Sequence, residues 1–164
     1  MTTRKTFTLN TGTKIPAIGL GTWQSEPNEV RDAVKLALQK GYRHIDTAIA
    51  YENEHEVGQG IKDSGIPRSE IWVTTKLDNT WHHRVTEGID SSLKSLGMDY
   101  VDLYLIVNMF VGEASREETD IEQHWPSSTD PNDTKKHLPD WDFIKTWYAP
   151  SLISWQHLCQ LMKA

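Results

Sequence analysis

Short apolar runs recur along the first two thirds of the chain at a nearly constant interval. They begin at Ala17, Arg43, Ile71 and Val101, so successive starts lie 26, 28 and 30 residues apart. Two parallel strands need a crossover connection between them, and the crossover is usually a helix. The spacing therefore predicts an α/β fold with four strand–helix units. An open doubly wound sheet and part of an eight-stranded barrel both fit this repeat, and the spacing alone does not separate them.

The intervals between the runs carry helical patterns. In the first and third intervals, apolar residues recur three and four positions apart and so share one helical face. The second pattern, between Val57 and Ile61, is weaker because Gly58 and Gly60 interrupt it. Ahead of the first run, the stretch FTLNTGTKIP predicts a hairpin that turns at residues 10–13. The apolar positions of the two stronger patterns are Val30, Ala33, Val34, Ala37, Leu38, Val85, Ile89, Leu93 and Leu96.

Charge and composition narrow the class of partner. The net charge is −6, from 23 acidic and 17 basic residues, and the sequence shows no basic cluster. This balance argues against nucleic acid or an anionic membrane as a partner and favours a small-molecule substrate. The chain has a single cysteine, Cys159, no signal-peptide pattern and no long apolar run. We therefore expect a soluble, cytoplasmic protein without internal disulfides.

Three polar side chains stand where an α/β fold carries its chemistry. Asp46 ends the second predicted strand, Lys76 ends the third, and Tyr51 follows Asp46 by five residues. The carboxyl ends of parallel strands meet at one edge of a sheet, where active sites form. At about 4 Å and an effective dielectric of roughly 20, an ammonium stabilises a phenolate by about 4 kcal/mol. A tyrosine beside a charged lysine can therefore act as a general acid toward an oxygen that gains negative charge.

Each of these residues also has an ordinary structural interpretation. Asp46 fits a helix cap or an Asx turn. Lys76 fits a surface lysine, and Tyr51 a packed ring with a hydrated hydroxyl. Their joint placement favours the catalytic interpretation. His82 and His83 have no further ligand at a metal-binding spacing, so we expect no metal site and interpret them as a solvated helix start.

Four segments closely resemble the aldo-keto reductase superfamily, its fungal members in particular. They are IPAIGLGTW at 15–23, GYRHIDTAIAYENEHEVGQGI at 41–61, IWVTTKL at 71–77 and SLKSLGMDYVDLYLI at 92–106. The resemblance implies that residues 1–106 form the N-terminal half of a (β/α)8 TIM barrel, with an N-terminal hairpin and the first four βα units. It also implies an oxidoreductase of the fungal carbonyl or glycerol type, which reduces aldehydes and ketones to alcohols with NADPH.

The same resemblance assigns roles to individual residues. The family motif D-T-A-x-x-Y matches Asp46 and Tyr51, and the family lysine at the end of the third strand matches Lys76. The implied catalytic residues are Asp46, Tyr51, Lys76 and His124; the implied cofactor-binding residues are Gly21, Thr22 and Asp46; the implied substrate-binding residues are Trp23, Tyr51 and Trp125.

The family pattern breaks after Ile106. In the family the fourth strand runs directly into a His-Trp-Pro triplet, which this chain carries at 124–126, after 17 additional residues. We interpret residues 107–123 as a foreign insert, expected to be disordered. Valine codons begin with GT and glutamine can be encoded by CAG, so its ends fit a translated intron. Residues 124–147 resemble the family's loop and the start of helix four, and residues 148–164 are interpreted as a foreign tail after a second readthrough.

We expect the insert, the foreign tail and the lack of the later barrel strands to lower cofactor binding and catalytic activity. A complete barrel of this type takes roughly 250 residues or more, and its later strands carry the phosphate site. NADPH binding is therefore expected to be impaired, and activity to be weak or absent. One alternative is a non-catalytic half-barrel fragment that self-associates through open sheet edges or binds a partner. Another is an independent flavodoxin-like nucleotide-binding domain, although the lack of a phosphate-binding glycine-rich loop counts against it.

Overall fold

A computed structural model describes residues 5–26, 28–78, 81–82 and 84–106 of the chain. The expected insert at 107–123, the family-like stretch at 124–147 and the tail at 148–164 lie outside the described residues, as do His124 and Trp125. The interpretations of these segments therefore stay predictions.

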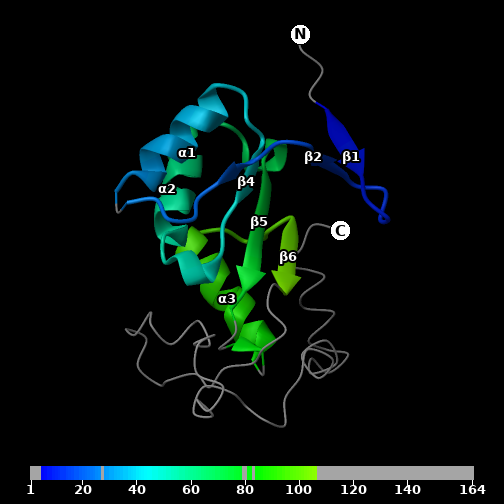
Figure 1. Cartoon of the computed structure of the whole chain (residues 1–164), viewed down its shortest axis with the longest axis vertical. Helices are drawn as coiled ribbons and strands as arrows, with labels where there is room; N and C mark the ends of the chain where they lie inside the picture. The colour runs from blue at the N-terminus through cyan, green and yellow to red at the C-terminus, as the bar shows by residue number, and fades with distance from the viewer. Residues whose placement is uncertain (1–4, 27, 79–80, 83, 107–164) are drawn as a thin grey trace, which may run out of the picture.

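Four parallel strands form the centre of the described region (Figure 1). They are β3 (Leu20–Gly21), β4 (His44–Asp46), β5 (Trp72–Leu77) and β6 (Leu103–Ile106), and each pairs with the next one in chain order. An open doubly wound sheet reverses its strand order at a switch point, whereas a barrel adds its strands in sequence. The uninterrupted order β3-β4-β5-β6 therefore favours part of a barrel over the open sheet.

Three helices connect these strands: α1 (Val30–Gln39), α2 (Glu54–Ser64) and α3 (Val85–Leu96). In Figure 1, α1 and α2 lie beside each other and α3 follows below them. The apolar face predicted for α3 and the positions Val30, Val34 and Leu38 of α1 are confirmed, because they join one buried core with strand residues such as Val73 and Leu77. At the other two predicted positions of α1, Ala33 is exposed and Ala37 is half-buried. Val73 and Leu77 are an even number of positions apart on β5 and so share one face of the sheet. The helices therefore cover that face.

Helix α2 forms despite the two glycines that weaken its sequence pattern. A Cβ atom on Gly58 would lie 2.0 Å from the carbonyl oxygen of Leu96 in α3. A Cβ atom on Gly60 would lie 2.5 Å from the carbonyl oxygen of Arg31 in α1. Glycine permits this approach because it has no side chain. The glycines in α2 are thus positions of close helix packing.

The strands β1 (Thr6–Thr8) and β2 (Lys14–Pro16) form the predicted antiparallel hairpin. The hairpin lies near the amino ends of the parallel strands, away from the end toward which the arrows of β5 and β6 point (Figure 1). The Ala17 N–H donates to the carbonyl oxygen of Lys5 at 3.0 Å, so the chain is still bonded to the hairpin there. The predicted run from Ala17 does contain a parallel strand, but that strand, β3, begins only at Leu20.

No helix in the described ranges is long and apolar enough to cross a lipid bilayer. The expected cytoplasmic location stays a prediction.

Candidate active site

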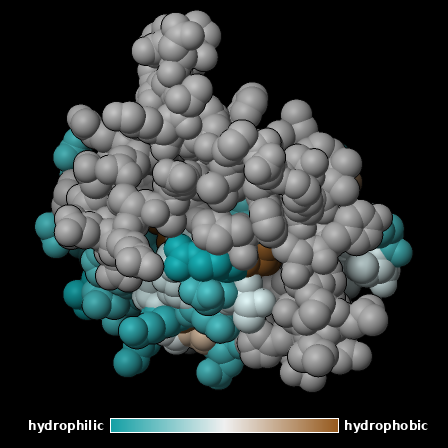
Figure 2. Space-filling model, turned by 90° about the horizontal axis from the view of Figure 1, so that it is seen from below, coloured by the Kyte–Doolittle hydropathy of each residue, from teal (hydrophilic) through white to brown (hydrophobic). Residues whose placement is uncertain are grey.

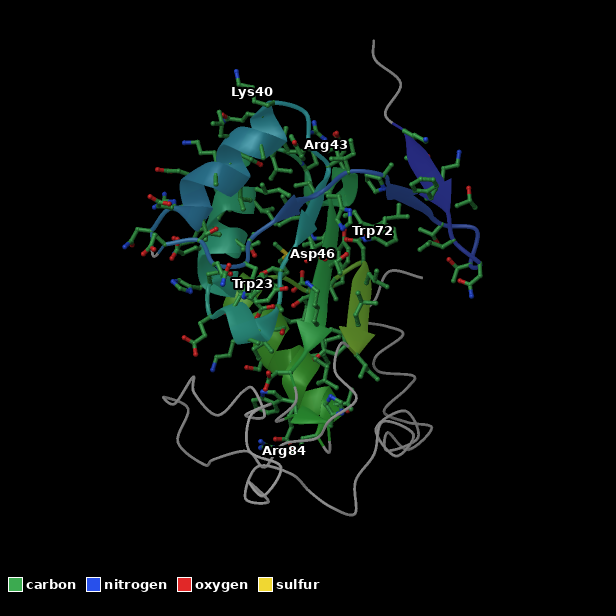
Figure 3. All side chains as sticks on the ribbon, viewed as in Figure 1. Trp23, Lys40, Arg43, Asp46, Trp72 and Arg84 are labelled. Atoms are coloured by element: carbon green, nitrogen blue, oxygen red, sulfur yellow. The ribbon has the colours of Figure 1, made fainter. Side chains whose placement is uncertain are left out.

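Asp46, Lys76 and Tyr51 come together at the carboxyl ends of β4 and β5. Asp46 ends β4, Lys76 is the penultimate residue of β5, and Tyr51 ends the 3-10 helix η1 (Ile49–Tyr51) that follows β4. The Nζ atom of Lys76 donates hydrogen bonds to Asp46 Oδ1 and, at 3.1 Å, to the hydroxyl oxygen of Tyr51. Figure 3 labels Asp46 at the centre of the molecule, beside the strands. The structure thus brings together the three side chains that the strand-end positions indicate, while their catalytic roles stay a prediction.

The ammonium of Lys76 is fixed by three acceptors. Besides Asp46 and Tyr51, it donates to the carbonyl oxygen of Thr47 at 2.9 Å. An ammonium has three N–H donors, so these bonds use all of them. The Lys76 side chain is only 14% exposed, and the Asp46 carboxylate beside it carries the opposite charge. Its position is therefore set by the backbone and side chains of the segment from β4 to η1.

The hydroxyl of Tyr51 is left able to donate. Its oxygen accepts a hydrogen bond from Lys76 Nζ, which also lies 4.9 Å from the centre of the tyrosine ring. Because the oxygen acts as the acceptor in this bond, its own hydrogen can point toward an external acceptor. The ammonium stabilises the negative charge that appears on the oxygen when this hydrogen leaves. The pair can thus deliver a proton to a bound oxygen atom.

A tight turn places Tyr51 over Lys76. The Tyr51 N–H donates to the carbonyl oxygen of Ala48 at 3.0 Å, which closes η1. Glu52 follows with a φ of 56°, in the left-handed region that residues other than glycine rarely adopt. The next residue, Asn53, is already the N-cap of α2. The turn therefore reverses the chain within one residue of Tyr51.

Trp23 and Thr22 follow β3 at the same end of the sheet, but the Trp23 side chain is exposed and the Thr22 side chain is buried. The Trp23 side chain is 61% exposed, and its ring centre lies 6.4 Å from that of Tyr51. Thr22 is 2% exposed, and its hydroxyl donates to Thr47 Oγ1 at 3.1 Å. The Thr22 side chain is thus engaged inside the protein, so cofactor contact would fall to its backbone. A Cβ atom on Gly21 would meet no atom within 4 Å, which leaves open space beside that backbone.

Asn53 and Glu54 support the site and were missed by the sequence reasoning. The Asn53 amide donates to the Thr22 carbonyl oxygen at 2.8 Å, and the Glu54 carboxylate accepts from Thr75 Oγ1 at 2.6 Å. Asparagine before a helix usually caps it, but this side chain makes no cap hydrogen bond. The available signal was the Asn-Glu pair directly after the turn that contains Tyr51.

Two further expectations concern histidines and metals. His82 is fully buried, so its interpretation as part of a solvated helix start was wrong; helix α3 begins later, at Val85. His83 lies outside the described residues. Across the described ranges, no group of three or more His, Cys, Asp or Glu side chains is arranged to hold a metal ion.

The surface at this end is mainly polar where described residues are in view. Figure 2 shows the molecule from below Figure 1, from the end toward which β5 and β6 point. The coloured residues in view there are mostly hydrophilic, with small hydrophobic areas between them.

Comparison with known proteins relates the chain to aldo/keto reductases. The model of the Aldo/keto reductase family matches residues 17–127, a range that includes His124 and Trp125. Glycerol 2-dehydrogenase (NADP(+)) of Saccharomyces cerevisiae is 50% identical over 159 residues, which cover 87% of this chain and 46% of the relative. Aldehyde reductase YPR1 of the same yeast is 43% identical over 162 residues, which cover 87% of this chain and 45% of the relative. The chain thus spans about half the length of these curated relatives.

A solved structure, the aldose reductase from Schistosoma japonicum, matches with a TM-score of 0.79 and 34% identity. The match covers 98% of this chain and 51% of that structure. The strand order, the helices on one face and this similarity together identify the fold as part of a (β/α)8 barrel.

Proposed function

The chain belongs to the aldo/keto reductase family, and from this premise we propose that it carries the proton-donating part of an NADPH-dependent carbonyl reductase site. In this proposal Asp46, Tyr51 and Lys76 are catalytic residues for the reduction of aldehydes or ketones to alcohols. His124 is a fourth catalytic residue and Trp125 a substrate-binding residue; both lie outside the described residues. The whole protein's substrate is proposed only as a class, a small carbonyl compound.

The observation that carries the proposal is the position of Lys76 Nζ between Asp46 Oδ1 and the Tyr51 hydroxyl oxygen. When bound, NADPH supplies a hydride to the carbonyl carbon, so that the carbonyl oxygen gains negative charge. Tyr51 donates its hydroxyl proton to this oxygen, which completes the alcohol. Lys76 stabilises the resulting phenolate, and Asp46 keeps the ammonium charged and oriented. Water then restores the proton on Tyr51.

The reacting end of NADPH suits the residues at the end of β3 and β4. Gly21 pairs with Asp46 across these strands, and the space beside the Gly21 backbone is open within 4 Å of a Cβ position. The Gly21 backbone would therefore leave room for a flat ring of the cofactor, and the Trp23 ring nearby is exposed. In the proposal, Gly21, the Thr22 backbone and Asp46 hold this end of the cofactor. Trp23 and Tyr51 form the described part of the carbonyl pocket.

The activity proposal is tested by the oxidation of NADPH by the chain in the presence of an aldehyde, followed by absorbance. Tyr51→Phe is expected to lower the rate by about 100-fold or more, because it removes only the donated proton. An unchanged rate in Tyr51→Phe would overturn the assignment of Tyr51. Fluorescence titration with NADPH measures binding separately, and a weak or unsaturable signal is expected if the grip on the cofactor is impaired.

Self-association is a second function proposed for the chain. Within the described residues, β3 and β6 stand at the two ends of the sheet, and Leu105 of β6 is exposed. An unpaired strand edge presents backbone groups to which another chain can pair. Sedimentation velocity over a concentration series checks this proposal. An average mass that rises with concentration is expected, and a constant monomer mass would contradict it.

A further inference from the structure

Glu54 is a buried carboxyl group beneath the candidate active site. It is the first residue of α2, three positions after Tyr51, and its side chain is 2% exposed. Its Oε1 atom accepts a hydrogen bond from Thr75 Oγ1 at 2.6 Å. Thr75 is itself fully buried and directly precedes Lys76 in β5. One hydrogen bond thus connects the segment that carries Tyr51 to the strand position beside Lys76.

Thr75 and Lys76 are neighbours on a strand, so their side chains point to opposite faces of the sheet. Lys76 reaches Tyr51 at the end of the sheet, while Thr75 reaches Glu54 on the helix side. The hydrogen bond from Thr75 to Glu54 therefore holds α2 against β5 at a point where both residues are buried. A shift of α2 along the strand would carry the turn with Tyr51 away from Lys76.

Asn53 makes a corresponding contact on the other side of the turn. Its amide nitrogen donates to the Thr22 carbonyl oxygen at 2.8 Å, and its side chain is 8% exposed. Thr22 directly precedes Trp23, whose ring lies beside that of Tyr51. Asn53 and Glu54 thus hydrogen-bond the turn that carries Tyr51 to the segment after β3 and to β5, respectively.

We propose that Asn53 and Glu54 are positioning residues that fix the Tyr51 hydroxyl relative to Lys76 and Trp23. This proposal rests on the proposed function of Tyr51 as the proton donor. The hydrogen bond between Glu54 and Thr75 is the contact through which it is tested. The Glu54 carboxyl group is buried, and burial raises its pKa. A buried polar group costs free energy unless it is hydrogen-bonded, so the contact with Thr75 matters for folding as well.

Thr75→Val and Thr75→Ser form the first pair of test variants, made in the full chain. Valine has nearly the shape of threonine but no hydroxyl, so it removes the donor to Glu54, whereas serine keeps the donor. Reactant misplacement of about 1 Å can cost about 100-fold in rate. We therefore expect kcat to fall about tenfold in Thr75→Val, with the KM for NADPH within about twofold of the original, and Thr75→Ser to restore kcat.

Glu54→Leu and Glu54→Gln repeat the test from the other partner. Leucine removes the acceptor, and glutamine keeps an oxygen at the position of Oε1. Glu56→Gln is the matched control, because Glu56 is also buried in α2 but accepts from the Asn28 N–H at 3.0 Å and not from β5. Glu56→Gln is expected to leave kcat unchanged.

A spectroscopic measurement makes the outcome independent of turnover. The chain is labelled with tyrosine carrying ¹³C at Cζ, and the Tyr51 resonance is identified as the one lost in Tyr51→Phe. This resonance is expected to move in Thr75→Val and Glu54→Leu, to return in Thr75→Ser and Glu54→Gln, and to stay in place in Glu56→Gln.

The results separate the two proposals. If the chain turns over no carbonyl compound but the Tyr51 resonance follows the expected pattern, the proposed activity fails and the positioning role stands. If Thr75→Val and Glu54→Leu lower only the midpoint of unfolding, with the Tyr51 resonance and kcat retained, the positioning role is overturned. If Glu54→Leu does not fold, the Thr75 pair alone decides.

Discussion

Lys76 in β5 donates a hydrogen bond of 3.1 Å to the hydroxyl oxygen of Tyr51, a residue 25 positions earlier in the chain. The two residues meet because β4 and β5 are adjacent and parallel, and because the turn after β4 folds back over the end of β5. The contact joins a charged donor to a neutral phenol at the edge of the sheet. It therefore places a cationic donor within hydrogen-bonding distance of the oxygen that would carry negative charge if Tyr51 gave up its proton.

Lys76→Met is expected to lower the rate of carbonyl reduction by about 100-fold or more, since it removes the charge that stabilises the Tyr51 phenolate. Methionine keeps much of the length and apolar volume of the lysine side chain. The Asp46 side chain is 37% exposed, so water can hydrate its carboxylate after the ammonium is gone. The measurement is the initial rate of NADPH oxidation at saturating aldehyde. Lys94→Met, at an exposed position of α3, serves as the control; equal losses in the two variants would contradict the role of Lys76.

The proximity of Asp46, Lys76 and Tyr51 could be predicted from the sequence, because all three lie at or just after the ends of predicted parallel strands. Asp46 ends β4, Lys76 is the penultimate residue of β5, and Tyr51 follows β4 closely, so a parallel sheet brings them to one edge. The partners of Asn53 and Glu54 were not predictable, because Thr22 and Thr75 lie 31 and 21 positions away. Such contacts depend on strand register and on the depth to which a helix packs. One sequence contains neither quantity directly.

The fold, like the site, has features that the sequence predicted and features that depend on tertiary contacts. The repeat of strand and helix predicted four parallel strands, while the choice between sheet and barrel needed the observed strand order. The late start of β3 depends on a bond from Ala17 to Lys5, which comes from the hairpin and not from local hydrophobicity. The burial of His82 depends likewise on tertiary packing, which can bury a residue type that usually lies nearer the surface.

Gly58→Ala is expected to lower the free energy of unfolding by about 3 kcal/mol, because the new methyl group meets backbone and cannot be relieved by a rotamer change. The obstacle is the carbonyl oxygen of Leu96, 2.0 Å from the Cβ position. Urea unfolding followed by tryptophan fluorescence measures the change. Gln59→Ala, at the exposed neighbouring position of α2, should stay within about 0.5 kcal/mol of the original chain. A small effect of Gly58→Ala would show that α2 and α3 can separate at low cost.

Arg68→Met is expected to destabilise the chain by about 3 kcal/mol, since it leaves the largely buried Asp102 carboxylate without its cation. Arg68 belongs to the 3-10 helix η2 (Arg68–Glu70) and donates to Asp102 Oδ2 at 2.8 Å. It also donates to the carbonyl oxygens of Ile71 and Tyr100, at 2.5 and 3.0 Å, and so joins the starts of β5 and β6. Thermal or urea unfolding provides the measurement.

The control for Arg68 is an ion pair of similar chemistry on the surface. Arg31 pairs with Asp63 at 2.5 Å, but its side chain is 51% exposed. Arg31→Met is expected to cost less than about 1 kcal/mol, because water already screens this pair. Equal costs for the two arginine variants would mean that burial of the Arg68 pair contributes nothing.

Because the pKa of Glu54 is raised, we expect this residue to lower the free energy of unfolding as the pH rises. Burial raises its pKa above the ordinary value of 4.5. The hydroxyls of Thr75 and Ser92 and, less strongly, the charge of Lys76 act in the opposite direction, and the Tyr104 phenol on β6 is also nearby. Above pH 4.5 the unfolded chain has released this proton and the folded chain still holds it, so folding is favoured less as the pH rises through the folded pKa. Glu54→Gln is expected to flatten this part of the profile of unfolding free energy against pH. Parallel profiles for the two proteins would refute the assignment to Glu54.

Because the pKa of His44 is lowered, we expect this residue to lower the free energy of unfolding as the pH falls. Burial lowers its pKa below the ordinary value of 6.5. The Pro16 carbonyl and the carboxylates of Asp46 and Asp102 oppose the shift, and the Lys76 ammonium adds to it. As the pH falls below 6.5, the unfolded chain binds a proton that the folded chain still resists, so the free energy of unfolding falls until the folded pKa is passed.

The test for His44 uses His44→Gln, whose side chain can still hydrogen-bond to Thr74 Oγ1, the partner of His44 Nε2 at 3.0 Å. The variant cannot take up the proton, so its unfolding free energy is expected to decline less than that of the original chain between pH 6.5 and the folded pKa. Urea unfolding at closely spaced pH values gives both profiles, and the difference between them isolates His44 from the opposite contribution of Glu54. If the two profiles keep the same slope throughout this window, protonation of His44 is not what weakens the fold in acid.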